Sequence, residues 1–164
     1  MKRGGVLNMK LSAAIAAMGH DDIMLVCDAG LPLVYDDRVI DLALAPDVPD
    51  LFTVLRTIRQ EMWVEKFAFI AETVDFNPVV VNTVKEIFPD AAMATMPNEW
   101  FHQIAVSGAK YVVRTGAWRP WGNVALWSGI PVVEWFDVTG ADIPADWRER
   151  YEKNRLYGKV GLKG

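Results

Sequence analysis

The sequence is poor in cysteine, in excess positive charge and in long apolar runs, and each shortage excludes a class of protein. Its one cysteine, Cys27, cannot form an internal disulfide, and a lone thiol fits a reducing cytoplasm. The 17 basic and 21 acidic residues give a net charge of −4 without a basic block, which argues against nucleic-acid binding. No apolar run reaches the length that spans a bilayer, and the N-terminus lacks the long apolar core of a secretion signal. We therefore expect a cytoplasmic protein without a membrane partner.

What the sequence does contain is enough apolar material for one folded unit. Hydrophobic residues make up 52% of the 164 positions and charged residues 23%, a balance typical of a globular protein with a packed core. This length suits one domain better than two. After Pro131 the composition becomes highly charged, so we expect a domain over 1–131 and a C-terminal extension over 132–164 that packs on the same or a neighbouring subunit.

Helical and extended segments alternate along the chain. Apolar residues at helical spacing, preceded by capping residues, predict helices over 8–19, 49–60, 77–88, 97–106 and, in the extension, 142–158. Gly19 suits the left-handed position after the first of these helices. Short apolar runs predict strands over 23–27, 39–44, 64–72, 91–96, 110–116 and 123–129. This alternation predicts an α/β fold, a single α/β/α layered domain with a largely parallel sheet.

The stretch MGHDDIMLVCDAGLP, residues 18–32, carries polar side chains at both ends of a predicted strand. Asp28 follows the carboxyl end, where open α/β sheets place their ligand crevice. It could hold sugar hydroxyls or a cation, or it could begin a turn. His20 precedes the strand and could carry a proton near neutral pH, or it could be an ordinary polar loop residue. Cys27 is expected in the core.

Several other residues admit both a functional and a purely structural interpretation. Trp121 could stack on a sugar face, and Asn123 could both donate to and accept from a hydroxyl, although both could serve loop packing alone. Glu61 and Glu65, in QEMWVE, could be surface charges or could orient a histidine. No second histidine lies at ligand spacing from His20, so we expect no metal.

An apolar strand that ends in Asp is also typical of receiver domains, which accept a phosphoryl group. That interpretation requires an acidic pair on the first strand–helix loop, a hydroxyl residue on a later strand and a well-placed lysine. Thr95 and Lys110 meet the last two requirements only loosely, so we regard this alternative as the weaker one.

Five ordered segments resemble the family of D-ribose pyranase and L-fucose mutarotase, the RbsD/FucU family. They cover about residues 1–131 and read MKRGGVLN, MGHDDIMLVCDAGLP, VIDLALAPDVPDLFTVL, QEMWVEKFAFIAE and VVRTGAWRPWGNVAL. The resemblance implies an RbsD-like fold and a cofactor-free isomerase that interconverts ring forms or anomers of a free monosaccharide by general acid–base ring opening. It also implies that His20 is the proton donor, that Asp28 binds the sugar, and that Trp121, Gly122 and Asn123 line the pocket.

Three departures from the family pattern bear on the substrate. Trp121 stands where members often have a tyrosine, so a hydroxyl is replaced by an N–H donor. Asn98 stands where the ribose branch has a second pocket histidine, and His102 lies one helical turn further on; either residue could take that role. Ala117 replaces the glutamate of a common Ser/Thr-Gly-Glu sequence.

The spacing of His20 and Asp28 adds an expectation about assembly. If residues 22–27 are extended, they span roughly 20 Å at about 3.3 Å per residue, too far for both side chains to hold one monosaccharide. Either the turn folds back over the sheet edge, or the pocket is shared between subunits, and we favour the shared pocket. The resemblance implies a ring-like homo-oligomer, with a decamer among the expected sizes. The alternative function is a non-catalytic monosaccharide-binding protein in sugar transport or regulation.

Overall fold

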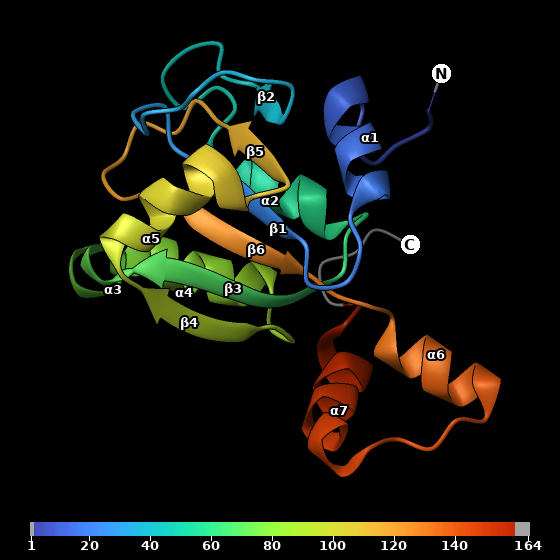
Figure 1. Cartoon of the computed structure of the whole chain (residues 1–164). Helices are drawn as coiled ribbons and strands as arrows, with labels where there is room; N and C mark the ends of the chain where they lie inside the picture. Colours follow the sequence, from blue (N-terminus) through green and yellow to red (C-terminus); the bar gives the residue numbers. More distant parts are fainter. Residues whose placement is uncertain (1, 160–164) are drawn as a thin grey trace.

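The computed structural model of the chain describes residues 2–159, apart from the side chains of residues 105 and 106. A six-stranded sheet lies at its centre (Figure 1), in the order β2-β5-β1-β6-β3-β4. The strands are β1 (Ile23–Cys27), β2 (Val39–Asp41), β3 (Val64–Ile70), β4 (Ala92–Met96), β5 (Tyr111–Arg114) and β6 (Val124–Ser128).

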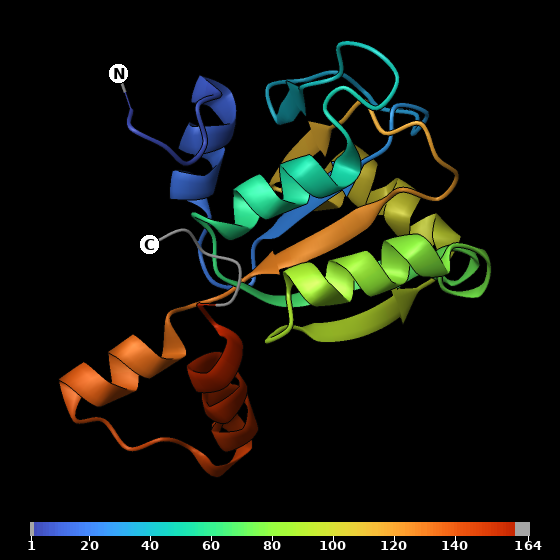
Figure 2. The same cartoon turned by 180° about the vertical axis from the view of Figure 1, so that it is seen from behind.

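Helices cover both faces of this sheet, which confirms the predicted layers. They are α1 (Met9–Ala17), α2 (Leu51–Arg59), α3 (Ala71–Phe76), α4 (Pro78–Ile87), α5 (Asn98–Gln103), α6 (Val132–Thr139) and α7 (Arg148–Tyr157), with a π-helical turn at Ile104–Gly108 and a 3-10 turn at Ala145–Trp147. α2 and α4 lie on the face seen in Figure 2, and α5 lies on the face seen in Figure 1. Within the described residues, no helix is long and apolar enough to cross a membrane.

Side-chain caps account for the helix starts that the sequence predicts. Asn8 accepts a hydrogen bond from the N–H of Leu11 at the start of α1, and Asp50 caps α2 in the same way. The prediction for Gly19 is wrong: α1 ends in an extended residue, Met18, and the left-handed residue of the following turn is Asp21, with φ 66°. An aspartate tolerates this conformation better than most residues with a side chain.

The sheet is largely parallel, as predicted, but one central strand runs the other way. β6 pairs antiparallel with both β1 and β3, whereas the pairs β1–β5, β2–β5 and β3–β4 are parallel. The connection between β5 and β6, residues 115–123, contains no helix, and a parallel return needs a crossover that is usually helical. The carboxyl ends of the other five strands and the amino end of β6 therefore meet at one edge of the sheet.

Alternate residues of β1 enter two separate cores. Met24 and Val26 belong to the core beneath α1, α2 and α4, whereas Leu25 and Cys27 belong to the core beneath α5. Cys27 is fully buried, as expected, and this burial raises the pKa of its thiol. The apolar run of β1 is therefore explained by cover on both faces.

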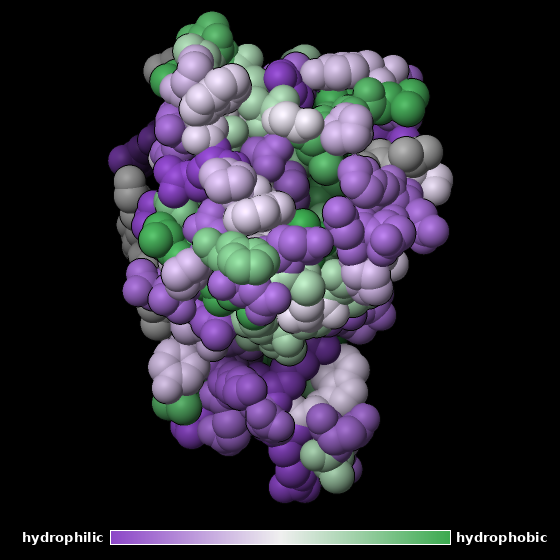
Figure 3. Space-filling view, turned by 90° about the vertical axis from the view of Figure 1, so that its left-hand side faces the viewer, coloured by the Kyte–Doolittle hydropathy of each residue, from purple (hydrophilic) through white to green (hydrophobic). Residues whose placement is uncertain are grey.

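The C-terminal extension forms a helical hairpin of α6 and α7 at the other edge of the sheet (Figure 1). In the view of Figure 3 this lower lobe carries mainly hydrophilic side chains. α7 contacts the body of the same chain: the buried Arg59 donates to the carbonyl oxygens of Tyr157 and Gly158, at 3.1 and 2.9 Å. The hairpin is thus attached through the end of α7 as well as through the chain that leads into α6.

Candidate functional site

A pocket of about 520 Å³ lies at the edge where the carboxyl ends of five strands meet, the position at which α/β sheets place ligands. Its volume falls in the range of small-molecule sites. The residues that line it come from the loop after β1, the end of β3, α5 and the β5–β6 loop; they are Asp28, Gly30, Leu31, Pro32, Ile70, Asn98, His102, Ala117, Trp118, Arg119, Pro120, Trp121 and Asn123. Five of the residues predicted from the sequence therefore share one cavity.

Asp28 is tied to the β5–β6 loop through its side chain and its backbone. Its Oδ2 accepts from the N–H of Gly122 at 3.2 Å, and its own N–H donates to Oδ1 of Asn123 at 3.1 Å. Its Oδ1 accepts from the N–H of Gly30 at 2.9 Å, which is the turn contact of the structural interpretation. The structural interpretation of Asp28 is therefore confirmed, and the same residue also lines the pocket. Gly122 does not line the pocket in this chain, but its N–H helps to orient the carboxylate.

The backbone around Trp121 is held by two residues that the sequence did not single out for the site. The Thr73 hydroxyl donates to the carbonyl oxygen of Trp121 at 3.0 Å, and the Asn77 amide donates to that of Pro120 at 2.8 Å. The backbone of Trp121 adopts the left-handed conformation, with φ 56°. The centre of its ring lies 5.6 Å from the centre of the Phe76 ring. Trp121 as a whole remains 36% exposed. Asn77 carried a sequence signal only as the cap of α4.

Asn98 and His102 both line the pocket from α5, one helical turn apart. The same helix face therefore presents an amide and an imidazole to one cavity. Ala117 lies in the pocket wall and is itself buried against the core. Trp118, beside it, is 70% exposed at the rim.

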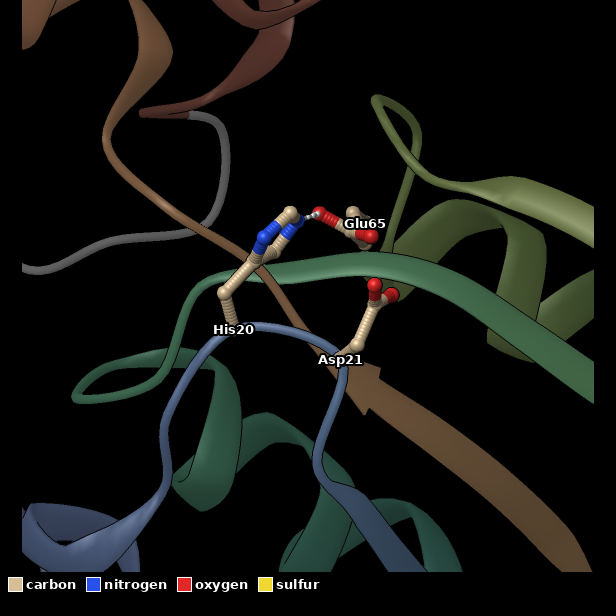
Figure 4. Close-up of side chains that lie close together, drawn as sticks. All are labelled: His20, Asp21 and Glu65. Carbon is tan, nitrogen blue, oxygen red and sulfur yellow. Dashed lines mark hydrogen bonds and ion pairs between the residues drawn. The ribbon is translucent and has the colours of Figure 1, made fainter.

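His20 lies at the opposite end of β1 from this pocket. The turn that carries it is fastened to the end of β6, where the N–H of Asp21 donates to the carbonyl of Ser128 at 2.9 Å. Nε2 of His20 lies 2.9 Å from Oε2 of Glu65 on β3 (Figure 4), and the imidazole is 38% exposed. β1 is extended, as the sequence predicted, so a single chain does not bring His20 and Asp28 to one sugar.

Two side chains, His20 and Arg150, contact the carboxylate of Glu65. Arg150 of α7 forms an ion pair with the same Oε2 that faces His20. Burial raises the pKa of Glu65, and this effect outweighs the lowering caused by Arg150 and His20; the nearby Asp21 side chain adds to the increase. The sequence indicated Glu65 as a residue that could orient a histidine, and this contact is present.

Glu61, predicted as a possible site residue beside Glu65, contacts a different part of the chain. Its Oε1 accepts from the N–H of Val6 at 2.7 Å and from Nζ of Lys2 at 3.2 Å. Glu61 therefore fastens the N-terminal segment, and within the described residues it neither touches His20 nor lines the pocket. The reason is that Glu61 lies in the turn after α2, whereas Glu65 lies on β3 itself.

His20, Asp21 and Glu65 each offer a potential metal-ligand atom, and these atoms lie within 4.8 Å of one another. Arg150 is already paired with Glu65 at this point. A divalent cation bound there would meet the guanidinium charge at close range, which opposes binding. The contacts are those of an ion-pair cluster, and we assign no metal to it.

Comparison with known proteins places the chain beside sugar isomerases. Residues 1–131 match the model of the RbsD / FucU transport protein family. The protein named D-ribose pyranase 2 of Rubrobacter xylanophilus is 41% identical over 150 residues, covering 92% of this chain and 97% of that protein. The D-ribose pyranase 1 of Streptomyces griseus is 40% identical, with coverages of 92% and 99%.

A solved structure agrees in fold as well as in sequence. Bacillus subtilis RbsD, determined in complex with D-ribose, superposes with a TM-score of 0.73 at 32% identity and covers 79% of this chain and 98% of its own. The RbsD-like α/β fold that the sequence predicted is thereby confirmed. From the family match, the relatives and the shared fold, we conclude that the chain belongs to the RbsD/FucU family.

Proposed function

We propose that this protein is a cofactor-free isomerase that interconverts ring forms or anomers of a free monosaccharide, with an aldopentose such as D-ribose as its substrate. The observation that carries the proposal is the single pocket that Asp28, Asn98, Asn123 and the partly exposed Trp121 line together. These residues supply several hydrogen-bonding groups and one aromatic plate, the combination that a polyol with an apolar face requires. The names of the pyranases at about 40% identity support ribose in particular.

The chemistry needs one acid and one base. The base takes the proton of the anomeric hydroxyl while the acid protonates the ring oxygen, so that the C–O bond of the ring opens to the free aldehyde. Attack by a hydroxyl on either face, or by a different hydroxyl, then closes the ring in a new form, and both protons are returned. Because sugars already interconvert in water, modest acid–base assistance is sufficient. We assign the acid role to His20, because histidine is the side chain whose ordinary pKa lies closest to neutral pH.

This assignment requires the pocket to be completed by a second subunit. His20 and Asp28 lie at opposite ends of β1, so the imidazole of one subunit would face the Asp28 pocket of its neighbour in a closed homo-oligomer. Trp118 lines the pocket and shares a neighbouring hollow with Leu44. Both side chains are apolar and strongly exposed, of the kind that subunit contacts bury. A cytoplasmic location remains a prediction from the single cysteine.

Saturation-transfer NMR between the pyranose and furanose signals tests the proposal. The protein should accelerate exchange for D-ribose or another aldose. His20→Ala should abolish the acceleration while ribose still binds, and Asp28→Ala should abolish binding. If no sugar is accelerated but ribose binds, the protein is a binding module for transport or regulation and the catalytic proposal fails.

Mixing the two inactive variants tests the shared pocket. After dissociation and reassembly of His20→Ala with Asp28→Ala, some pockets combine an intact His20 from one subunit with an intact Asp28 from the other. The mixture should therefore regain part of the activity, which neither variant shows alone. A mixture that assembles but stays inactive would show that each chain supplies both residues to the same pocket.

A further inference from the structure

The C-terminal extension reaches back to His20. Arg150 pairs with the Glu65 oxygen that faces His20 Nε2. The Trp147 ring, just before α7, lies 6.3 Å from the His20 ring, centre to centre. Arg150 also stacks over Trp147, with its guanidinium carbon 4.9 Å from the ring centre. The extension therefore supplies two of the groups around this imidazole, although it lies outside the 1–131 segment that the family model matches.

The position of Arg150 is set by the attachment of α7 to the body of the protein. Asn154, one turn after Arg150 and on the same helix face, donates to Oδ2 of Asp90 at 3.2 Å. Asp90 is in turn paired with the buried Arg59, which holds the last carbonyl groups of α7. Arg150 is thus directed at Glu65 by a helix face that is fixed at its far end.

We propose that Arg150, together with Trp147, is a positioning residue for His20 and acts through the shared carboxylate of Glu65. An ionised Glu65 accepts a hydrogen bond from Nε2–H, so Nδ1 is the ring nitrogen that takes up a proton and donates it as the acid. Arg150 holds that carboxylate in place and takes up part of its charge. The role in catalysis rests on the proposed function of His20; the contact itself does not.

Loss of Arg150 should change the titration of His20. The charged and titratable groups that face this imidazole are Glu65 from β3, Asp21 from its own turn and Arg150 from α7. Without the guanidinium, Glu65 would no longer pair with an arginine and would interact with His20 alone. The repulsion between the guanidinium and a protonated His20 would also be removed. Both effects favour the imidazolium, so the midpoint of the His20 titration should rise by about one pH unit.

NMR titration of the imidazole signals measures this directly, because the chain has two histidines. His102 lies in the pocket at the other edge of the sheet and serves as the internal reference. Arg150→Ala should raise the His20 midpoint and leave that of His102 unchanged. The matched control is Arg155→Ala, on the same helix, whose exposed guanidinium pairs with Glu152; it should move neither midpoint.

Two further variants make the result decisive. Arg150→Lys, which keeps the charge, should restore most of the wild-type midpoint. Arg150→Gln removes the charge but keeps a hydrogen-bonding group against Glu65. If the alanine variant does not fold, the glutamine variant takes its place in the titration and should likewise raise the His20 midpoint. An unchanged His20 midpoint in a folded variant without the charge overturns the proposal.

The failure of this inference can be told apart from the failure of the proposed function. If the wild type accelerates ribose exchange but its pH profile superposes on that of Arg150→Ala, the positioning role is wrong and the isomerase stands. If no sugar is accelerated while the His20 midpoint rises as expected, the contact is real and the catalytic assignment is wrong.

Discussion

The buried ion pair between Arg59 and Asp90 leads to a quantitative prediction about stability. Their side chains are only 3% and 2% exposed, and Nη2 of Arg59 lies 2.9 Å from Oδ1 of Asp90. Arg59→Met keeps most of the aliphatic stem but leaves a buried carboxylate with the Asn154 amide as its remaining partner among the described residues. Removing one member of a buried pair costs about 3–5 kcal/mol, which lowers Tm by about 6–20 °C in a chain of this size.

Thermal and urea unfolding followed by far-UV circular dichroism measure this loss. The double variant Arg59→Met/Asp90→Leu should recover much of it, because two apolar side chains then replace two charges. Arg155→Ala, an arginine from an exposed ion pair, should cost less than about 1 kcal/mol. A single Arg59→Met variant as stable as this surface control would refute the reasoning, and so would a double variant no better than the single one.

Three further predictions concern the turns near the two sites. In Gly116→Ala the new Cβ would come within 2.5 Å of the carbonyl oxygen of Ala45, so the 45–48 loop must move. The free energy of unfolding, measured with urea, should fall by about 1–3 kcal/mol. Calorimetry should show weaker ribose binding. Because the φ of Trp121 is 56°, the Trp121→Gly variant should be more stable to unfolding than Trp121→Ala by about 1 kcal/mol. Both variants lose the indole and should bind ribose less tightly. Lys110 and the N–H of Gly19 lower the pKa of Asp22, so the stability that this carboxylate contributes is present above the ordinary Asp pKa and is lost as the pH falls through the lowered value. Asp22→Asn should therefore lower the free energy of unfolding by less than about 1 kcal/mol at neutral pH. In acid, the free energies of unfolding of the variant and the wild type, measured with urea, should become more alike.

Much of the fold could be predicted because its signals are local. The apolar run Ile23–Cys27 is too short for a helix and is buried on both faces, and Asp50 and Asn77 cap the helices that they were expected to begin. α3 was missed because it follows β3 without a break, and its N-cap, Ile70, makes no side-chain hydrogen bond. α6 was missed for a similar reason, since no side chain caps its start.

The sequence could predict several of the residues that belong to the candidate site, but not the contacts that hold them in place. Asp28, Asn123 and Trp121 were indicated by their residue types, by their places after or before a strand and by the family resemblance. Thr73 was not, because its hydrogen bond goes to a backbone carbonyl and leaves no pattern in the sequence. The choice between Glu61 and Glu65 as the partner of His20 likewise depended on which of them lies on β3.

The sequence by itself determined what depends on neighbouring residues: the helices with their caps, the short buried strands, and the family to which their order belongs. Only the tertiary structure decided the direction of β6, the separation of His20 from the pocket, and the return of Arg150 to Glu65 from 85 positions along the chain. The physical reason is that periodicity and capping act over a few residues. Contacts between distant segments depend instead on the path of the whole chain and on which edge of the sheet each loop reaches.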